Sequence, residues 1–387
     1  MDPFADVELD DLRRRTGTKW TRYGPDVIPA WIADADLPVC PVIADAVLAA
    51  VARGDLTYPP DDAPDEVAAA FVERMSVRHG WSPDPAGVIL VADLVQAFSL
   101  AVDHLSEPGE GVLLQTPCYP PFLEEIAALE RRLVPSAWTR TDHGWDPDLD
   151  HMAEFAMSRR GGVLVLVKPH NPTGRVWRCD ELTEVARIAE DADLVVISDE
   201  IHAELIHDDH VHVPFASMGT EAAARTITLT SASKSFNSPG LRCGVMHLGP
   251  GARLEPLRRV RPSQIGQINN LGMAGTLAAW RNGGAWLESF RLAMTGRRDA
   301  FAAMLDDLLP GVEWIPPEAT YLAWLDCGAL ELGDDPAQWF LDHALVALSS
   351  GPTFGAGGRG YARLNLATSP GVLSEIVERM VTALDLR

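Results

Sequence analysis

Short apolar runs alternate with longer amphipathic segments through the middle of the chain. Residues 93–105, between the first two runs, carry apolar side chains at helical spacing. Uniformly apolar, β-branched strands separated by helices predict a mostly parallel sheet with helices on both faces. The runs are residues 88–92, 111–115, 163–167, 194–198 and 226–230.

The pattern changes toward the C-terminus. It becomes helical from about residue 264, and residues 280–308 predict one long amphipathic helix. Strand-like segments at 321–325 and 362–366 and a final helix from about 373 predict a smaller α+β domain. We therefore expect three parts: an N-terminal segment, 1–48, packed with the small domain; a large domain, 49–275; and a small C-terminal domain, 276–387.

Polar, chemically capable residues follow three of the predicted strands. They lie at 168–174, 199–202 and 231–235. Ligands of open α/β sheets bind outside the carboxyl ends of the strands. The three clusters therefore predict one shared pocket.

Composition narrows the class of partner. The chain has 387 residues, 47 % of them hydrophobic, and a formal charge of −23 from 32 basic and 55 acidic side chains. Such an acidic surface repels nucleic acid and anionic membranes. No apolar run approaches the roughly 18 residues of a membrane span. The five cysteines are scattered and the N-terminus lacks a signal peptide, so we expect a soluble, cytoplasmic protein.

Two motifs are more simply explained without a ligand. Residues 355–360 match G-x-G-x-x-G, but a strand follows them where a dinucleotide site needs a helix, so we expect a turn. His207, His210 and His212 lie close together in the sequence, but at a loose spacing that favours a polar loop. No metal is expected.

Four residues suggest the chemistry of the pocket. Lys234, flanked by serines, suits an imine with a carbonyl cofactor. Asp199 ends a buried strand and could hold a protonated ring nitrogen, and Asn171 could donate to a phenolate oxygen. Arg363 could bind a substrate carboxylate. A lysine imine with an acidic partner for a pyridinium is the arrangement expected for pyridoxal 5'-phosphate.

At these residues the chain resembles the fold-type-I pyridoxal-phosphate enzymes of the aspartate aminotransferase superfamily. Within it, the chain resembles the MalY/PatB group of cystathionine β-lyase-like C–S lyases. The resemblance implies the aspartate aminotransferase-like fold, an α/β architecture with a large and a small domain. The matching stretches are 19–20, 28–36, 119–122, 170–174, 198–202, 233–241, 320–326 and 363–365.

The resemblance also assigns roles around the cofactor ring. Lys234 would form the imine and then move the Cα proton, and Asp199 would pair with the pyridine nitrogen. Asn171 would donate to the 3′ oxygen. His202 stands where many aminotransferases have a tyrosine that shares this task. Tyr119 would stack on the ring face.

The cofactor phosphate would meet the backbone amides of Leu94 and Val95 at a helix start, with Ser231 and Arg242. Tyr58 resembles the tyrosine that reaches the phosphate of the neighbouring subunit, which implies a homodimer with shared active sites.

For the substrate, the resemblance implies that Arg363 binds the α-carboxylate, with Asn171 and Trp31 nearby. The implied reaction is β-elimination on L-cysteine S-conjugates such as cystathionine, giving thiol, pyruvate and ammonia. Three alternatives stay open: an aminotransferase, a specialised enzyme for a natural-product thioconjugate, and a regulatory protein that holds the cofactor and binds a partner.

The chain departs from the family pattern at three places. Asp93 replaces a glycine before the phosphate-binding amides, where a carboxylate is unfavourable unless it turns away to cap the helix. Arg242 is more typical of aminotransferases. Ala35 and Leu37 replace bulkier residues in a segment expected to line the substrate entrance, which predicts a roomier pocket.

Overall fold

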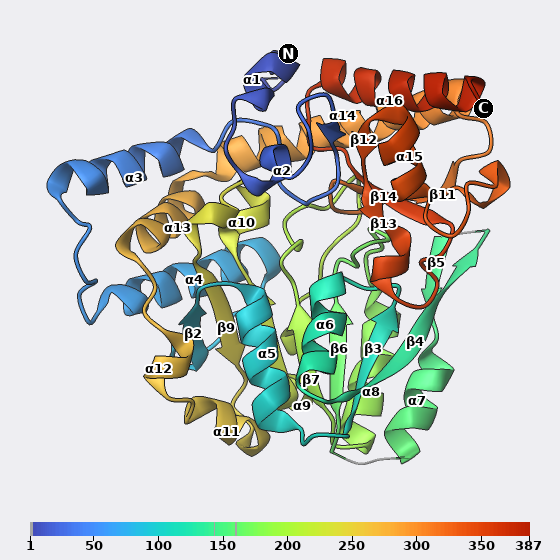
Figure 1. Ribbon diagram of the computed structural model, residues 1–387. Coiled ribbons are helices and arrows are strands. Elements are labelled where there is room, and N and C mark those ends of the chain that lie inside the picture. Colours follow the sequence, from blue (N-terminus) through green and yellow to red (C-terminus); the bar gives the residue numbers. More distant parts are fainter. Residues whose placement is uncertain (1–2, 143, 159–160) are drawn as a thin grey trace.

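The computed structural model describes residues 3–142, 144–158 and 161–387. A central sheet has the strand order β2-β9-β8-β7-β6-β3-β4-β5 (Figure 1). The strands from β4 through β3, β6 and β7 to β8 are parallel, while β2, β9 and β5 join antiparallel to their neighbours. The predicted mostly parallel sheet is therefore confirmed. The strands are β2 Val88–Val91, β3 Gly111–Thr116, β4 Arg132–Thr141, β5 Gly144–Pro147, β6 Val163–Val167, β7 Val195–Asp199, β8 Thr226–Thr230 and β9 Gly244–Leu248.

Helices cover both faces of this sheet, because successive side chains of a strand point to opposite sides. Val163 and Val165 of β6 pack in the core formed with α5 and α6. Leu164 and Leu166 pack on the other face, with α7 and α8. The covering helices are α5 Leu94–Leu105, α6 Pro120–Ala128, α7 Leu149–Ser158, α8 Cys179–Asp191, α9 Thr220–Arg225 and α11 Glu255–Arg258.

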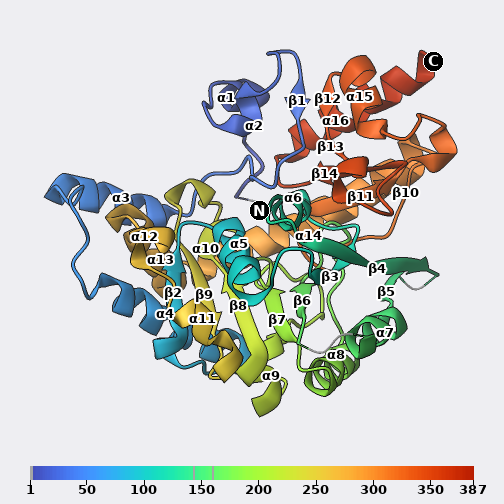
Figure 2. The same cartoon turned by 60° about the horizontal axis from the view of Figure 1, so that its bottom comes forward.

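A second, antiparallel sheet lies in the C-terminal part, with the order β10-β11-β14-β13. The N-terminal segment lies beside it, since β1 pairs in parallel with β12 (Figure 2). The elements of this region are α1 Leu9–Arg13, α2 Thr18–Thr21, β1 Ile28–Pro29, β10 Glu313–Trp314, β11 Leu322–Asp326, α15 Pro336–Ala344, β12 Val346–Ala347, β13 Ser349–Ser350, β14 Tyr361–Asn365 and α16 Pro370–Asp385.

The long helix expected over 280–308 is present and ends at Leu308, but it begins four residues later, at Gly284. The chain forms α13 Asn270–Asn282 and then α14 Gly284–Leu308, with a break at Gly283. A Cβ atom at Gly283 would lie 2.6 Å from both Ala279 O and Phe236 Cε1. Glycine is therefore required by close packing at a point where it also weakens a helix.

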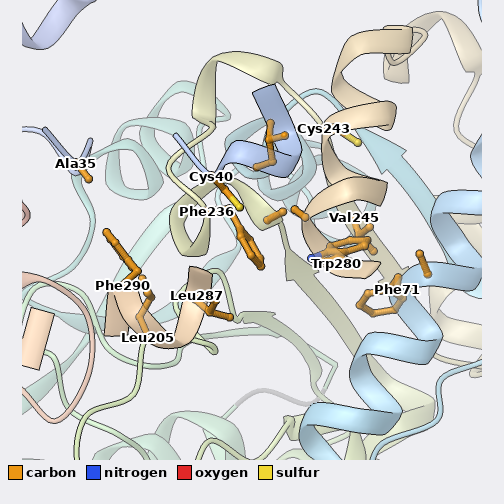
Figure 3. Packing of buried hydrophobic residues seen from close by; sticks show 14 of the residues in the cluster. Ala35, Cys40, Phe71, Leu205, Phe236, Cys243, Val245, Trp280, Leu287 and Phe290 are labelled. Atoms are coloured by element: carbon orange, nitrogen blue, oxygen red, sulfur yellow. The ribbon is translucent and has the colours of Figure 1, made fainter. Parts of the chain in front are cut away.

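An apolar core anchors the segment that carries Lys234. Phe236 follows this lysine by two residues and is fully buried. It packs in one cluster with Trp280, Leu287 and Phe290 (Figure 3). The packing of Phe236 therefore fixes the position of the backbone around Lys234. The remaining helices are α3 Pro41–Arg53, α4 Ala63–His79, α10 Ala232–Ser235 and α12 Pro262–Ile265.

Candidate active site

A cavity of about 240 Å³ lies at the carboxyl ends of the parallel strands. The three polar clusters predicted to share one pocket do so, because Asn171, Asp199 and Lys234 all line it. Ten of the twelve predicted site residues lie in its wall: Leu94, Val95, Tyr119, Asn171, Asp199, His202, Ser231, Lys234, Arg242 and Arg363.

Lys234 lies on the short helix α10 directly after β8. Its Nζ donates to the carbonyl of Ala33 at 2.7 Å and lies 3.7 Å from Asp34 Oδ1. Burial, with the charge of Arg363 acting in the same direction, lowers the pKa of Lys234 from its ordinary value. A lowered pKa increases the fraction of neutral amine, which is the form that attacks a carbonyl.

Asp199 is the last residue of β7 and is 6 % exposed. Its Oδ1 accepts a hydrogen bond from the Ile201 amide at 3.2 Å. Burial raises the pKa of Asp199 to about 7. A buried carboxyl of this kind is stabilised as the anion when a cation lies next to it, as a protonated ring nitrogen would.

Asn171 and Arg363 meet across the cavity. Arg363 Nη1 donates to Asn171 Oδ1 at 2.8 Å. This contact orients the amide, so that its nitrogen is the donor that a ring oxygen would meet.

Arg363 lies on β14 and is 4 % exposed. Its Nη2 donates to the Trp31 carbonyl at 3.1 Å and to Ser349 Oγ at 3.2 Å. Burial lowers its pKa to about 10, so the guanidinium stays charged at neutral pH. Among the residues that the structure describes, its Nε is a buried donor without a hydrogen-bond partner.

His202 and Tyr119 complete the wall. His202 is 3 % exposed, and burial lowers its pKa to about 3, so its ring is neutral. Within the described ranges its Nδ1 has no hydrogen-bond partner. Tyr119 precedes α6, and its ring is held edge-on by Phe122 at a centroid distance of 5.5 Å.

The first amides of α5 face the other end of the cavity. Leu94 and Val95 occupy the first two helical positions, whose N–H groups have no partner within a helix. Together with the helix dipole they favour an anion. Ser231 is the N-cap residue of α10, and its hydroxyl donates to the Cys243 carbonyl at 2.9 Å.

Asp93 turns to cap α5, as the sequence suggested. Its Oδ1 accepts from the Gln96 amide at 2.8 Å. Its Oδ2 forms an ion pair with the guanidinium of Arg242. Both side chains line the cavity beside the free amides of the helix.

Two predicted site residues lie elsewhere. Tyr58 is 87 % exposed on the single subunit, in the connection between α3 and α4. Trp31 lines a second cavity of about 540 Å³, with Tyr23 and Phe354. This second cavity shares Ile32, Tyr119 and Arg363 with the first.

The sequence did not point to the strap that covers Lys234, residues 31–37. Asn365 Nδ2 donates to the carbonyls of Ile32 and Asp34 at 2.7 and 2.8 Å, and Asn237 Nδ2 binds those of Ala35 and Leu37 at 3.1 and 2.9 Å.

Lys19 pairs with Asp36 of the strap at 2.8 Å, and both side chains are buried. In the sequence, Lys19, Asp36, Asn237 and Asn365 fall in the stretches that resemble the family.

Ala35 and Leu37, expected at the substrate entrance, are not in the wall of the cavity that holds Lys234. Both are buried and face a different cavity, beside Lys19, Trp20 and Asn237.

The histidines at 207–212 belong to separate polar contacts. His207 Nε2 contacts the Thr320 carbonyl at 2.5 Å, and His212 Nε2 contacts Glu200 Oε2 at 2.9 Å. Across the described residues, no group of three histidine, cysteine or acidic side chains is placed to hold a metal. Among the same residues, no helix has the length and apolar character to cross a membrane.

The donor set fits pyridoxal 5'-phosphate. The partly buried Lys234 suits its aldehyde, Asp199 its ring nitrogen, and the Asn171 amide its 3′ oxygen. The start of α5 suits its phosphate.

Comparisons with known proteins agree with this geometry. Residues 32–380 match the family described as aminotransferase class I and II. The chain is 32 % identical to cystathionine beta-lyase of Corynebacterium glutamicum, over 97 % of this chain and 99 % of that protein. It is 29 % identical to cystathionine beta-lyase PatB of Bacillus subtilis, over 98 % of this chain and all of that protein.

A solved structure shares the fold. Cystalysin from Treponema denticola, which contains a pyridoxal 5'-phosphate cofactor, superimposes with a TM-score of 0.93. It is 27 % identical, with all of both chains covered. The chain therefore belongs to the aminotransferase class I and II family, and within it to the MalY/PatB group of fold-type-I pyridoxal-phosphate enzymes.

Proposed function

We propose that this protein is a pyridoxal-phosphate-dependent C–S lyase that acts on L-cysteine S-conjugates such as cystathionine. The observation that carries the proposal is the placement of Lys234, Asp199 and Arg363 in one buried cavity. The similarity to cystathionine beta-lyases over nearly the whole chain supports the same reaction class.

The chain's own groups divide the work of the reaction. Arg363 binds the α-carboxylate of the substrate, and Asn171 holds its guanidinium in place. Lys234 holds the cofactor and then, as a free amine, takes the proton from Cα. When bound, the cofactor supplies an electron sink for the electrons left at Cα, and Asp199 keeps its ring nitrogen protonated.

The electron pair left at Cα forms a double bond to Cβ as the bond between Cβ and sulfur breaks. The thiolate leaves with the electron pair of that bond, and the remaining three-carbon enamine takes up water to give pyruvate and ammonia. The buried site supplies Cα acidity and orientation, because a thiolate is already a good leaving group.

The second cavity gives room for the group on sulfur. It opens beside Arg363, which fixes the carboxylate end of the substrate, and its wall is formed by Trp31, Tyr23 and Phe354. We place the S-substituent there, with Trp31 as a substrate-binding residue.

The active unit is a homodimer. Exposed Tyr58 has no place in the cavity of its own subunit, which suits a residue that reaches the phosphate of the partner. Mixed dimers of Lys234→Ala and Tyr58→Phe chains test this directly. We expect one intact site per mixed dimer and recovered activity; mixtures as inactive as the two parents would contradict shared sites.

The cytoplasm is the proposed compartment. All five cysteines carry free thiols, and Cys179 is exposed. A reducing environment preserves such thiols.

The reaction is tested with a panel of cysteine S-conjugates and no keto acid. A lyase releases thiol and pyruvate in equal amounts from each substrate. A transaminase on the same scaffold would leave the C–S bond intact, so amino-group transfer without thiol would overturn the proposal.

A further inference from the structure

The ion pair between Asp93 and Arg242 has a consequence for cofactor binding. Asp93 comes just before α5, and Arg242 lies 149 residues later in the connection to β9. Their side chains are 30 % and 56 % exposed, at the open edge of the cavity. They meet beside the amides of Leu94 and Val95, where the donor set fits a phosphate.

The ion pair between Asp93 and Arg242 leaves little positive charge at the end of the cavity that suits the cofactor phosphate. A phosphate monoester carries a charge of about −1.5 to −2 at neutral pH. In the described cavity wall, Arg242 is the cation that contacts the residue preceding α5, and Asp93 already neutralises it. The hydroxyl of Ser231 is also engaged, by the Cys243 carbonyl. The free amides at the start of α5 are then the main groups that attract the phosphate anion.

We propose that Asp93 is an affinity-setting residue that competes with the cofactor phosphate for Arg242 and so keeps the cofactor weakly held and exchangeable. This inference rests on the proposed function, because it takes the phosphate of pyridoxal 5'-phosphate as the ligand. If Arg242 is to bind the phosphate, its guanidinium must leave the Asp93 carboxylate or be shared with it. Phosphate binding also places two anions, the phosphate and the Asp93 carboxylate, side by side.

Capping alone does not account for an aspartate here. Asparagine and serine cap a helix about as well as aspartate, since each offers an oxygen to the free amides. What aspartate adds at position 93 is a negative charge. A substitution by asparagine therefore removes the charge and keeps the bond to the Gln96 amide.

The test is a titration of the cofactor-free protein with pyridoxal 5'-phosphate and, separately, with pyridoxal. Quenching of tryptophan fluorescence gives the apparent Kd without any measurement of turnover. For Asp93→Asn we expect a Kd for pyridoxal 5'-phosphate at least about 10-fold lower than for the wild type, and a Kd for pyridoxal within about twofold. Asp93→Ser should behave in the same way.

Asp103→Asn is the matched control. It removes one negative charge from the far end of the same helix, where Asp103 is 49 % exposed beside Arg131. We expect neither Kd to change.

Three results overturn the inference. One is an unchanged or higher Kd for pyridoxal 5'-phosphate in Asp93→Asn, which would mean that Asp93 holds Arg242 ready for the phosphate. Another is an equal change for both ligands, which would show no role of the phosphate. The third is an equal change in Asp103→Asn. If the wild type and all variants fail to bind either ligand, the proposed function itself falls.

Discussion

Replacement of Asp199 by asparagine isolates the charge of the carboxyl that faces the cofactor ring. The two side chains have the same shape, and an amide oxygen can still accept from Ile201 N–H. In the cofactor-free protein, burial raises the pKa of Asp199 to about 7. In an unfolded chain the same group has a pKa of about 3.9.

The sign of the stability change follows from this difference. Between about pH 4 and 7, the folded protein retains a proton that the unfolded chain has released, so the contribution of Asp199 to stability falls as pH rises. The full difference of about 3 pKa units corresponds to at most roughly 4 kcal/mol. Asp199→Asn does not titrate and avoids this loss.

Urea unfolding of the cofactor-free proteins measures the effect. The free energy of unfolding of Asp199→Asn, relative to the wild type, should rise by about 2 kcal/mol from pH 5.5 to pH 8. Asp307→Asn, at an exposed carboxyl on α14, controls for a general charge effect and should show no such rise. With pyridoxal 5'-phosphate bound, the wild type should have the higher free energy of unfolding at pH 8, because the Asp199 carboxylate then pairs with the ring nitrogen. A difference that is constant with pH would refute the reasoning.

Further predictions concern other parts of the site. Arg363→Lys should raise KM about 10- to 100-fold in a pyruvate assay, since lysine lacks the guanidinium fork and one charged hydrogen bond contributes about 1.5–3 kcal/mol; an unchanged KM would place the carboxylate elsewhere. Lys19→Met should lower the free energy of unfolding by about 3–5 kcal/mol in urea, because it leaves the Asp36 carboxylate buried without its charged partner; a loss below 1 kcal/mol would show that the pair is not needed. Tyr119→Leu should raise the Kd of pyridoxal 5'-phosphate up to about 10-fold, while Tyr119→Phe retains the ring and should not; equal effects of the two would argue against stacking.

The sequence pattern identified the buried parallel strands most closely. The predicted runs 163–167 and 226–230 coincide with β6 and β8, because both faces of these strands are covered by helices. Strand β4, Arg132–Thr141, was not predicted, because exposed and buried residues alternate along much of it near the sheet edge. Strand β9 was also missed, since His247 interrupts its apolar run and only short helical turns separate it from β8.

The candidate site was predictable where the chemistry is carried by single residues. Lys234 and Asp199 stood out because few structural roles need these groups at the ends of strands, and both line one cavity with Arg363. The pair of Asp93 with Arg242 was not predictable, because the two residues are distant in the chain and only the fold brings them together. The strap over Lys234 depends in the same way on Asn237 and Asn365.

The number of pyruvate molecules released per subunit tests the central claim most directly. The protein, loaded with pyridoxal 5'-phosphate, is given excess cystathionine and no keto acid, alongside Lys234→Ala. We predict many molecules of pyruvate per subunit from the wild type, with an equal amount of thiol, and none from the variant. At most one conversion per subunit in the wild type, or equal turnover by Lys234→Ala, would contradict a β-elimination carried out by Lys234 in this cavity.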